Sequence, residues 1–226
     1  MHGRHTKVRP HHYAAGVVAV LVALSLALGL AWFNRFRDTG GTAEVSRSAS
    51  SSTAVDAELA TCRAVWRAQS GVLAAAGSSL AQWRVHVDAM NQLVAGEITL
   101  AQAQDFWNRT RKGAAERVAR FEKADGTYAD AAPGCPGGST GSRADGGSRD
   151  LSSCVAGVRA RDRAIGAGTV ALDTWKHHIM AMEMLRSGQI TPEQATRMWL
   201  RSWRRGVRQL DTFTEVRRRA AVAGSC

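Results

Sequence analysis

The sequence contains little proline and tyrosine, with 4 and 2 residues respectively among 226. β-Branched residues are also sparse beyond the first 30 positions, which disfavours β-sheet folds and favours an all-helical one. No CxxC pair occurs, so a zinc ribbon or a thioredoxin-like redox site has no support. These absences predict an all-α protein without a cysteine-based metal or redox motif.

Motifs of the common enzyme classes are missing as well. No serine, cysteine or carboxylate pair stands at a recognisable spacing from a base, and the glycine-rich segments follow no predicted strand, which excludes a phosphate-binding loop. The sequence has neither a CxxCH site for covalent haem nor a Glu-x-x-His pattern for a di-iron centre. We therefore expect a protein that is not an enzyme.

Charged residues are absent from residues 14–33, a run of 20 apolar or small side chains. At 1.5 Å per residue, such a helix spans a hydrocarbon core of about 30 Å. The run is longer than the apolar region of a cleaved signal peptide, about 7–15 residues, which favours a retained transmembrane anchor. Residues 1–13 would then form a short basic cytoplasmic tail. The remainder would be extracytoplasmic at the cell membrane, or secreted if the segment is cleaved.

The cysteines are few and unevenly placed. All four lie beyond the apolar run, and an even number is typical of disulfide bonding in an oxidising compartment. Arginine far outnumbers lysine and alanine is abundant, a bias typical of GC-rich bacterial genomes. Together these features predict a protein of the bacterial cell envelope.

One stretch of the chain occurs twice, at a spacing of 92 residues. Residues 83–107 match residues 175–199 at 11 of 25 positions, and residues 62–124 match 154–216 at 19 of 63. Such gapless self-similarity indicates a tandem duplication. In each copy an apolar stripe at helical spacing ends at a glycine, Gly96 or Gly188, that can cap the first helix. Each copy is therefore predicted to fold as an αα-hairpin.

The second helix of each hairpin has a predicted start. Thr99 with Gln102, and Thr191 with Gln194, have the spacing of a capping box. One hairpin cannot bury both of its apolar stripes, so the two hairpins should pack as a four-helix bundle. The predicted segments are a transmembrane anchor (14–33), a flexible linker (34–54), hairpin repeat 1 (55–135), a Gly/Ser-rich linker (136–150) and hairpin repeat 2 (151–226).

The cysteine positions predict their own pairing. In each copy, one cysteine lies about 36 residues before the turn and another lies about as far after it. Residues equidistant from the turn of an antiparallel hairpin face each other. The expected disulfides are therefore Cys62–Cys135 and Cys154–Cys226, one closing each hairpin at its open end.

A histidine and a methionine four residues apart recur on the apolar stripe of both copies. If two-fold symmetry brings the stripes together, His86, Met90, His178 and Met182 converge, and such ligands suit copper(I) or haem iron. The alternative is that these side chains only pack the core, with Thr110 and Ser202 as hydrogen-bond partners of the imidazoles and no cofactor. A second set, His177, Met180 and Met184, faces outward in the second copy alone and could bind metal weakly.

Positive charge is concentrated on the last helix. Five arginines recur at helical spacing and form a stripe: Arg197, Arg201, Arg204, Arg205 and Arg208. Outside a bacterial membrane, this stripe could contact anionic lipid, an acidic envelope polymer or another envelope protein, whereas nucleic acid is not an expected partner. The alternative is a solvated surface without a partner.

The sequence thus favours a membrane-anchored, extracytoplasmic helical bundle with a binding or scaffolding role and no catalysis. The second hypothesis is a copper- or haem-binding protein that uses the duplicated His/Met pairs.

Overall fold

The computed structural model describes residues 40–131, 134–136 and 146–226. The chain divides into two compact units, Met1–Thr53 and Ala54–Cys226. Both repeats lie in the second unit, which is described below.

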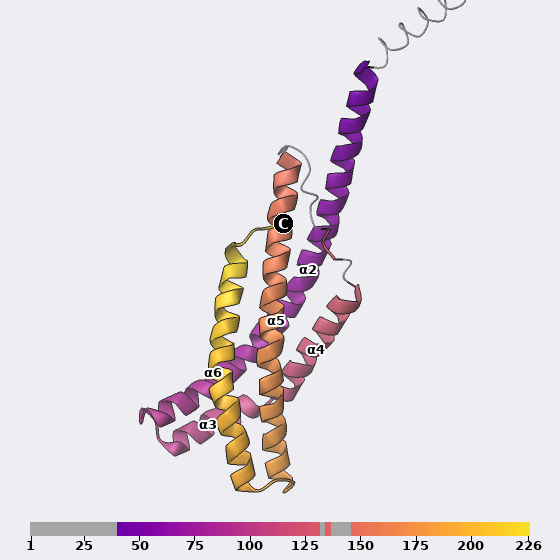
Figure 1. The fold of residues 1–226 in the computed structure, drawn as a ribbon. Helices are drawn as coiled ribbons and strands as arrows, with labels where there is room; N and C mark the ends of the chain where they lie inside the picture. Colours follow the sequence, from indigo (N-terminus) through magenta and orange to yellow (C-terminus); the bar gives the residue numbers. More distant parts are fainter. Residues whose placement is uncertain (1–39, 132–133, 137–145) are drawn as a thin grey trace, which may run out of the picture. The chain divides into compact units, whose positions relative to one another are not determined.

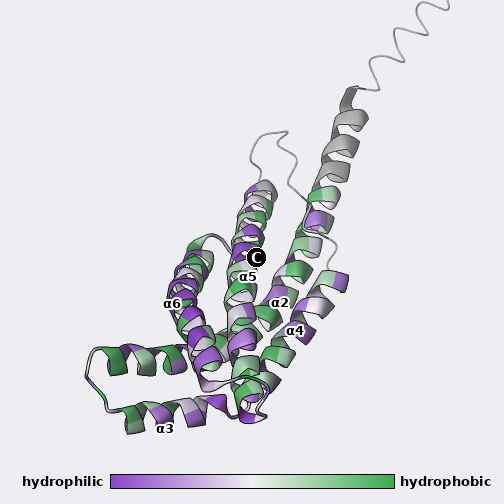
Figure 2. Ribbon diagram, turned by 60° about the horizontal axis from the view of Figure 1, so that its bottom comes forward, coloured by the Kyte–Doolittle hydropathy of each residue, from purple (hydrophilic) through white to green (hydrophobic). Residues whose placement is uncertain are grey.

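The described residues contain five helices and no strand, as the all-α prediction requires. The helices are α2 (Gly40–Val94), α3 (Leu100–Arg111), α4 (Ala114–Ala131), α5 (Gly146–Arg186) and α6 (Pro192–Val222). In repeat 2, α5 and α6 run side by side as one long hairpin (Figure 1). The tip of repeat 1, formed by the end of α2 and by α3, points in a different direction from the tip of repeat 2 in both views (Figures 1 and 2).

The predicted second helix of repeat 1 is divided into α3 and α4, which corrects the expectation of four helices in the two repeats. The division falls at Lys112 and Gly113, where the φ angle of Gly113 is 68°. A residue with a Cβ adopts this left-handed conformation at a cost, and repeat 2 has Arg205 at the equivalent position in an unbroken helix. The glycine thus permits the change of direction that separates the two hairpin tips.

Two helices begin earlier than the sequence suggested. Helix α2 starts at Gly40, inside the segment 34–54 assigned to a linker, and α5 starts at Gly146, inside the segment 136–150. Neither start contains proline, so no residue in either one removes a backbone N–H or blocks the helical turn before it.

No helix within the described ranges combines the length and apolarity needed to cross a membrane. The predicted anchor at residues 14–33 lies outside the residues that the structure describes, and it stays a prediction.

Both predicted helix-to-helix turns are confirmed. Gly96 and Gly188 adopt left-handed φ angles of 74° and 72°. In each turn the threonine side chain accepts from the amide N–H three residues later, and the glutamine side chain accepts from the threonine N–H, which completes the capping boxes at Thr99 and Thr191. The duplicated sequence therefore specifies the same local structure twice.

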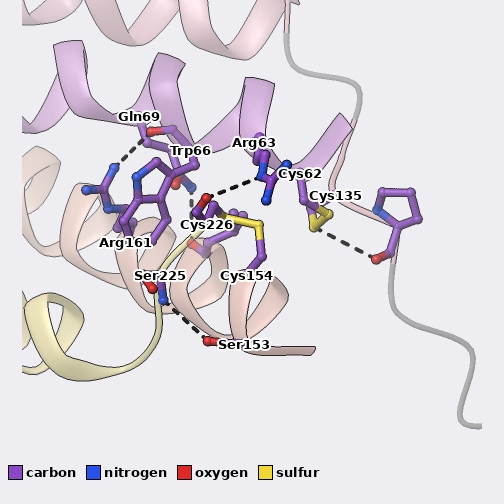
Figure 3. Close-up of a disulfide and its surroundings, with 12 residues drawn as sticks. Cys62, Arg63, Trp66, Gln69, Cys135, Ser153, Cys154, Arg161, Ser225 and Cys226 are labelled. Atoms are coloured by element: carbon purple, nitrogen blue, oxygen red, sulfur yellow. Dashed lines mark hydrogen bonds between the residues drawn. A yellow bond between two sulfur atoms is a disulfide. The ribbon is translucent and has the colours of Figure 1, made fainter. Parts of the chain in front are cut away.

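Both predicted disulfides are confirmed. Cys62 pairs with Cys135 and Cys154 pairs with Cys226, with Cα–Cα distances of 4.6 and 4.4 Å. The two bridges lie close together (Figure 3), and the Arg63 guanidinium donates to the Cys226 carbonyl between them. Their sulfurs share an apolar cluster with Leu59, Leu151 and Val155. Each bridge therefore fixes the open end of its own hairpin and also packs against the other repeat.

Equivalent residues of the two repeats meet in the main core, so the contact has approximate two-fold symmetry. The rings of Trp83 and Trp175, both 0% exposed, stack with centroids 4.4 Å apart. Around them the apolar residues of α2, α4, α5 and α6 form one cluster that includes Leu80 with Leu172 and Phe121 with Phe213.

Two ion pairs cross between the repeats, one in each direction. Arg84 on α2 reaches Asp211 on α6, and its repeat equivalent, Lys176 on α5, reaches Glu122 on α4. Both pairs are substantially exposed, so they contribute little to stability. The two basic residues are repeat equivalents and each reaches the other repeat, although their acidic partners are not equivalent: Asp211 corresponds to Ala119, and Glu122 corresponds to Thr214.

Candidate functional site

The two repeated histidines meet beside the stacked tryptophans. The Nε2 atoms of His86 and His178 are 3.0 Å apart, a hydrogen-bond distance, and the side chains are 6% and 5% exposed. Since these residues are repeat equivalents, their contact lies on the approximate two-fold axis. The structure therefore brings together the imidazoles that the sequence pattern singled out.

Hydrogen bonds define which ring nitrogens carry protons. The Thr110 hydroxyl donates to the Phe106 carbonyl at 2.8 Å, so it accepts from His86 Nδ1, also at 2.8 Å. His86 Nε2 then has a free lone pair, which accepts from His178 Nε2–H. His178 Nδ1 is left as a buried acceptor without a hydrogen-bond partner in the described part of the chain. Ser202, the equivalent of Thr110, does not supply one.

Burial keeps both imidazoles neutral. Desolvation lowers the pKa of His86 to about 2, and a charge on His178 would lower that pKa further. Desolvation alone lowers the pKa of His178 to about 4. Both rings are therefore uncharged around neutral pH, as the hydrogen-bond chain from His178 to Phe106 requires.

A pocket of about 610 Å³ opens beside this pair, between the two repeats. Helices α2, α3, α5 and α6 all contribute to its wall. The apolar part of the wall consists of Trp83, Val87, Met90, Trp107, Met182, Leu185, Trp199, Leu200 and Trp203. The polar part consists of His86, Gln104, Asn108, Arg111, His178, Arg186 and Thr196. This volume and largely apolar lining are typical of small-molecule sites.

Both methionines of the predicted metal set, Met90 and Met182, line this pocket with His86 and His178. The four side chains that the sequence grouped are therefore gathered at one place. The sequence did not lead us to predict that the other residues in the wall belong to a binding site. The signal was present in Trp107 and Trp199, which are identical between the repeats, and in Gln104, Asn108 and Arg111, which follow helical spacing on α3.

The outward set in the second copy does not reach the pocket. His177 and Met180 are exposed and Met184 is half-buried, while the His177 ring is 2.7 Å from the Asp173 carbonyl of its own helix. No group of three or more His, Cys, Asp or Glu side chains suited to a metal ion occurs among the described residues.

The arginine stripe is on the surface, as expected. All five residues are exposed and none forms an ion pair within the described part of the chain: Arg197, Arg201, Arg204, Arg205 and Arg208. Figure 2 shows hydrophilic residues along much of α6.

Comparisons with protein-family models, with curated proteins and with solved structures found no match to this chain. Function must therefore be argued from the site alone.

Proposed function

We propose that this chain is a non-enzymatic binding protein of the bacterial cell envelope, and that the pocket between the two repeats is its binding site. The observation that carries the proposal is the pocket itself, about 610 Å³ and lined by residues of both copies. A protein that needed the duplication only for stability could close this space with larger side chains. The predicted membrane anchor and the exposed arginines of α6 are consistent with a location beside an anionic envelope surface.

The pocket wall supports binding rather than catalysis. Four tryptophans provide flat apolar surface, and the two histidines are neutral and hydrogen-bonded to each other. No aspartate or glutamate lines the pocket. The site therefore offers contact surface without a carboxylate that could serve as a general base or nucleophile.

A neutral aromatic probe tests the proposal. Full-length protein in phosphatidylcholine nanodiscs should bind 2-naphthalenesulfonamide saturably, with empty nanodiscs as the blank. The double variant Gln104→Trp/Thr196→Trp places two bulky rings at exposed, repeat-equivalent positions of the wall and should weaken binding about tenfold or more. The control Asp105→Trp/Val170→Trp alters exposed positions outside the pocket and should bind as the wild type does. If both double variants bind the probe equally well, the probe does not bind in the pocket between the repeats.

A second candidate function, binding of copper(I), is favoured by the 3.0 Å approach of His86 and His178. His86 donates through Nδ1 to Thr110, so its Nε2 lone pair points at His178, which is the usual arrangement of a metal-ligating imidazole. His178 would ligate through Nε2 once its proton has moved to Nδ1, which has no partner in the described part of the chain. In a tetrahedral site with metal–nitrogen distances of about 2.0–2.1 Å, two nitrogens are about 3.3 Å apart, so the pair would open only slightly. Iron between the same two nitrogens would need a separation of about 4 Å, which makes haem the less favoured form.

Calorimetric titration of the full chain with copper(I) under reducing conditions separates the metal hypotheses. Binding at the pocket should be lost in Met90→Leu/Met182→Leu, which keeps apolar volume and removes both thioethers. If copper(I) binding is lost in Met180→Leu/Met184→Leu instead, the metal binds at the outward set. If the wild type gives no heat of binding, neither set binds copper(I).

A further inference from the structure

The pocket departs from two-fold symmetry in one respect, because its α3 wall is more polar than its α6 wall. On α3 the pocket is lined by Gln104, Asn108 and Arg111, which are spaced as one face of a helix. The equivalent residues of α6 are Thr196, Leu200 and Trp203. Trp107 and Trp199 are the same in both walls. The site therefore has an apolar half and a hydrogen-bonding half.

The charged side chains that line the pocket are all positive. Arg111 and Arg186 line the pocket, whereas no carboxylate does. Arg186 is exposed and forms an ion pair with Glu183 on its own helix. Arg111 is half-buried and forms neither an ion pair nor a side-chain hydrogen bond with any described residue. A cation with five donor N–H groups thus stands at the polar wall without an anionic partner from the protein.

We infer that the pocket takes an amphipathic organic anion, whose acidic group binds Arg111 on α3 and whose planar apolar body lies among the tryptophans toward α6. This inference rests on the proposed binding function and names its ligand class. A guanidinium binds carboxylate, sulfonate or phosphate oxygens through two parallel N–H bonds, and its partly desolvated position strengthens those bonds. Asn108 and Gln104 can donate further hydrogen bonds to the same group.

The helix break at Gly113 is part of this arrangement. It turns α3 away from the line of α4, whereas α6 continues without a break through Gly206. A Cβ at Gly206 would lie 2.6 Å from Trp83 Cζ2, so α6 packs closely against the other repeat at this point. The two walls of the pocket therefore differ in course as well as in polarity, since α3 ends at Arg111 and α6 is continuous.

The test compares two probes that differ in charge but hardly in shape, 2-naphthalenesulfonate and the neutral 2-naphthalenesulfonamide. With full-length protein in phosphatidylcholine nanodiscs, the sulfonate should bind about tenfold or more tightly than the sulfonamide. In Arg111→Gln the dissociation constants of the two probes should agree within about twofold. The matched control is Arg120→Gln on α4, an exposed arginine outside the pocket, and it should retain the full preference for the anion.

The outcomes separate this inference from the proposed function. Saturable binding of both probes without preference for the sulfonate would overturn the anion assignment and leave a binding pocket. The same preference in Arg111→Gln as in the wild type would also overturn it, because Arg111 would not be the anchor. If neither probe binds, both the ligand class and the proposed function are contradicted.

Discussion

Replacing Cys62 and Cys135 together by alanine is expected to lower the free energy of unfolding by about 4 kcal/mol. The bridge joins residues 73 apart in the sequence, and its loss frees a loop of that length in the unfolded chain. The Cys62 side chain is fully buried in an apolar cluster, so the variant also loses packing there. Urea unfolding of the full-length variant and wild type in the same nanodiscs measures the difference.

The second bridge provides a matched comparison. Cys154 and Cys226 are 72 residues apart in the sequence and lie in the same apolar cluster. The double variant Cys154→Ala/Cys226→Ala should therefore lose about the same free energy of unfolding. Thiol titration of each double variant should find no free cysteine, since the other bridge is independent. A loss below about 1 kcal/mol for both pairs, or a free thiol in the wild type, would show that the bridges do not hold the hairpins closed.

Lowering the pH from about 6.5 to 4.5 is expected to remove roughly 4 kcal/mol of stability through His86 and His178. In the folded protein both side chains stay neutral, because burial lowers the pKa of His86 to about 2 and that of His178 to about 4. In the unfolded chain both take up a proton near pH 6.5. Their contribution is therefore fully present above pH 6.5 and is lost as the pH falls toward the folded-state pKa values.

Denaturant unfolding at a series of pH values checks this prediction. His177→Gln should show the same pH dependence as the wild type, since His177 is exposed and outside the pair. In the double variant His86→Gln/His178→Gln, the free energy of unfolding should change clearly less with pH, even if the variant is less stable at every pH. Nitrogen-15 NMR measures the protonation state of each imidazole directly. A protonated His86 or His178 in the folded protein at pH 5 would contradict the account.

The duplication made much of the fold predictable. Two copies of a Gly-x-Ile-Thr turn define two hairpin centres, and distances counted from those centres were enough to pair Cys62 with Cys135 and Cys154 with Cys226. Capping at Thr99 and Thr191 depends only on residues within one turn of helix, so it could be predicted from the sequence.

Features that depend on contact between the repeats were not predictable in this way. Gly113 and Gly206 both stand in the second helices, but only Gly113 breaks its helix, and helical periodicity does not distinguish the two. Helical periodicity placed Trp107 and Arg111 on a helix, but it did not show which helix of the other repeat lies across the pocket from them. The contact between His86 and His178 was predicted only for the case in which the two repeats pack with two-fold symmetry.

The stoichiometry of probe binding tests the central claim, that the two hairpins build one shared site where they meet. Isothermal titration of full-length protein with 2-naphthalenesulfonate should give one bound probe per chain, because residues of both repeats line a single pocket beside the His86–His178 contact. A ratio of two would mean that each hairpin has its own site and would contradict the account, as would an absence of saturable binding.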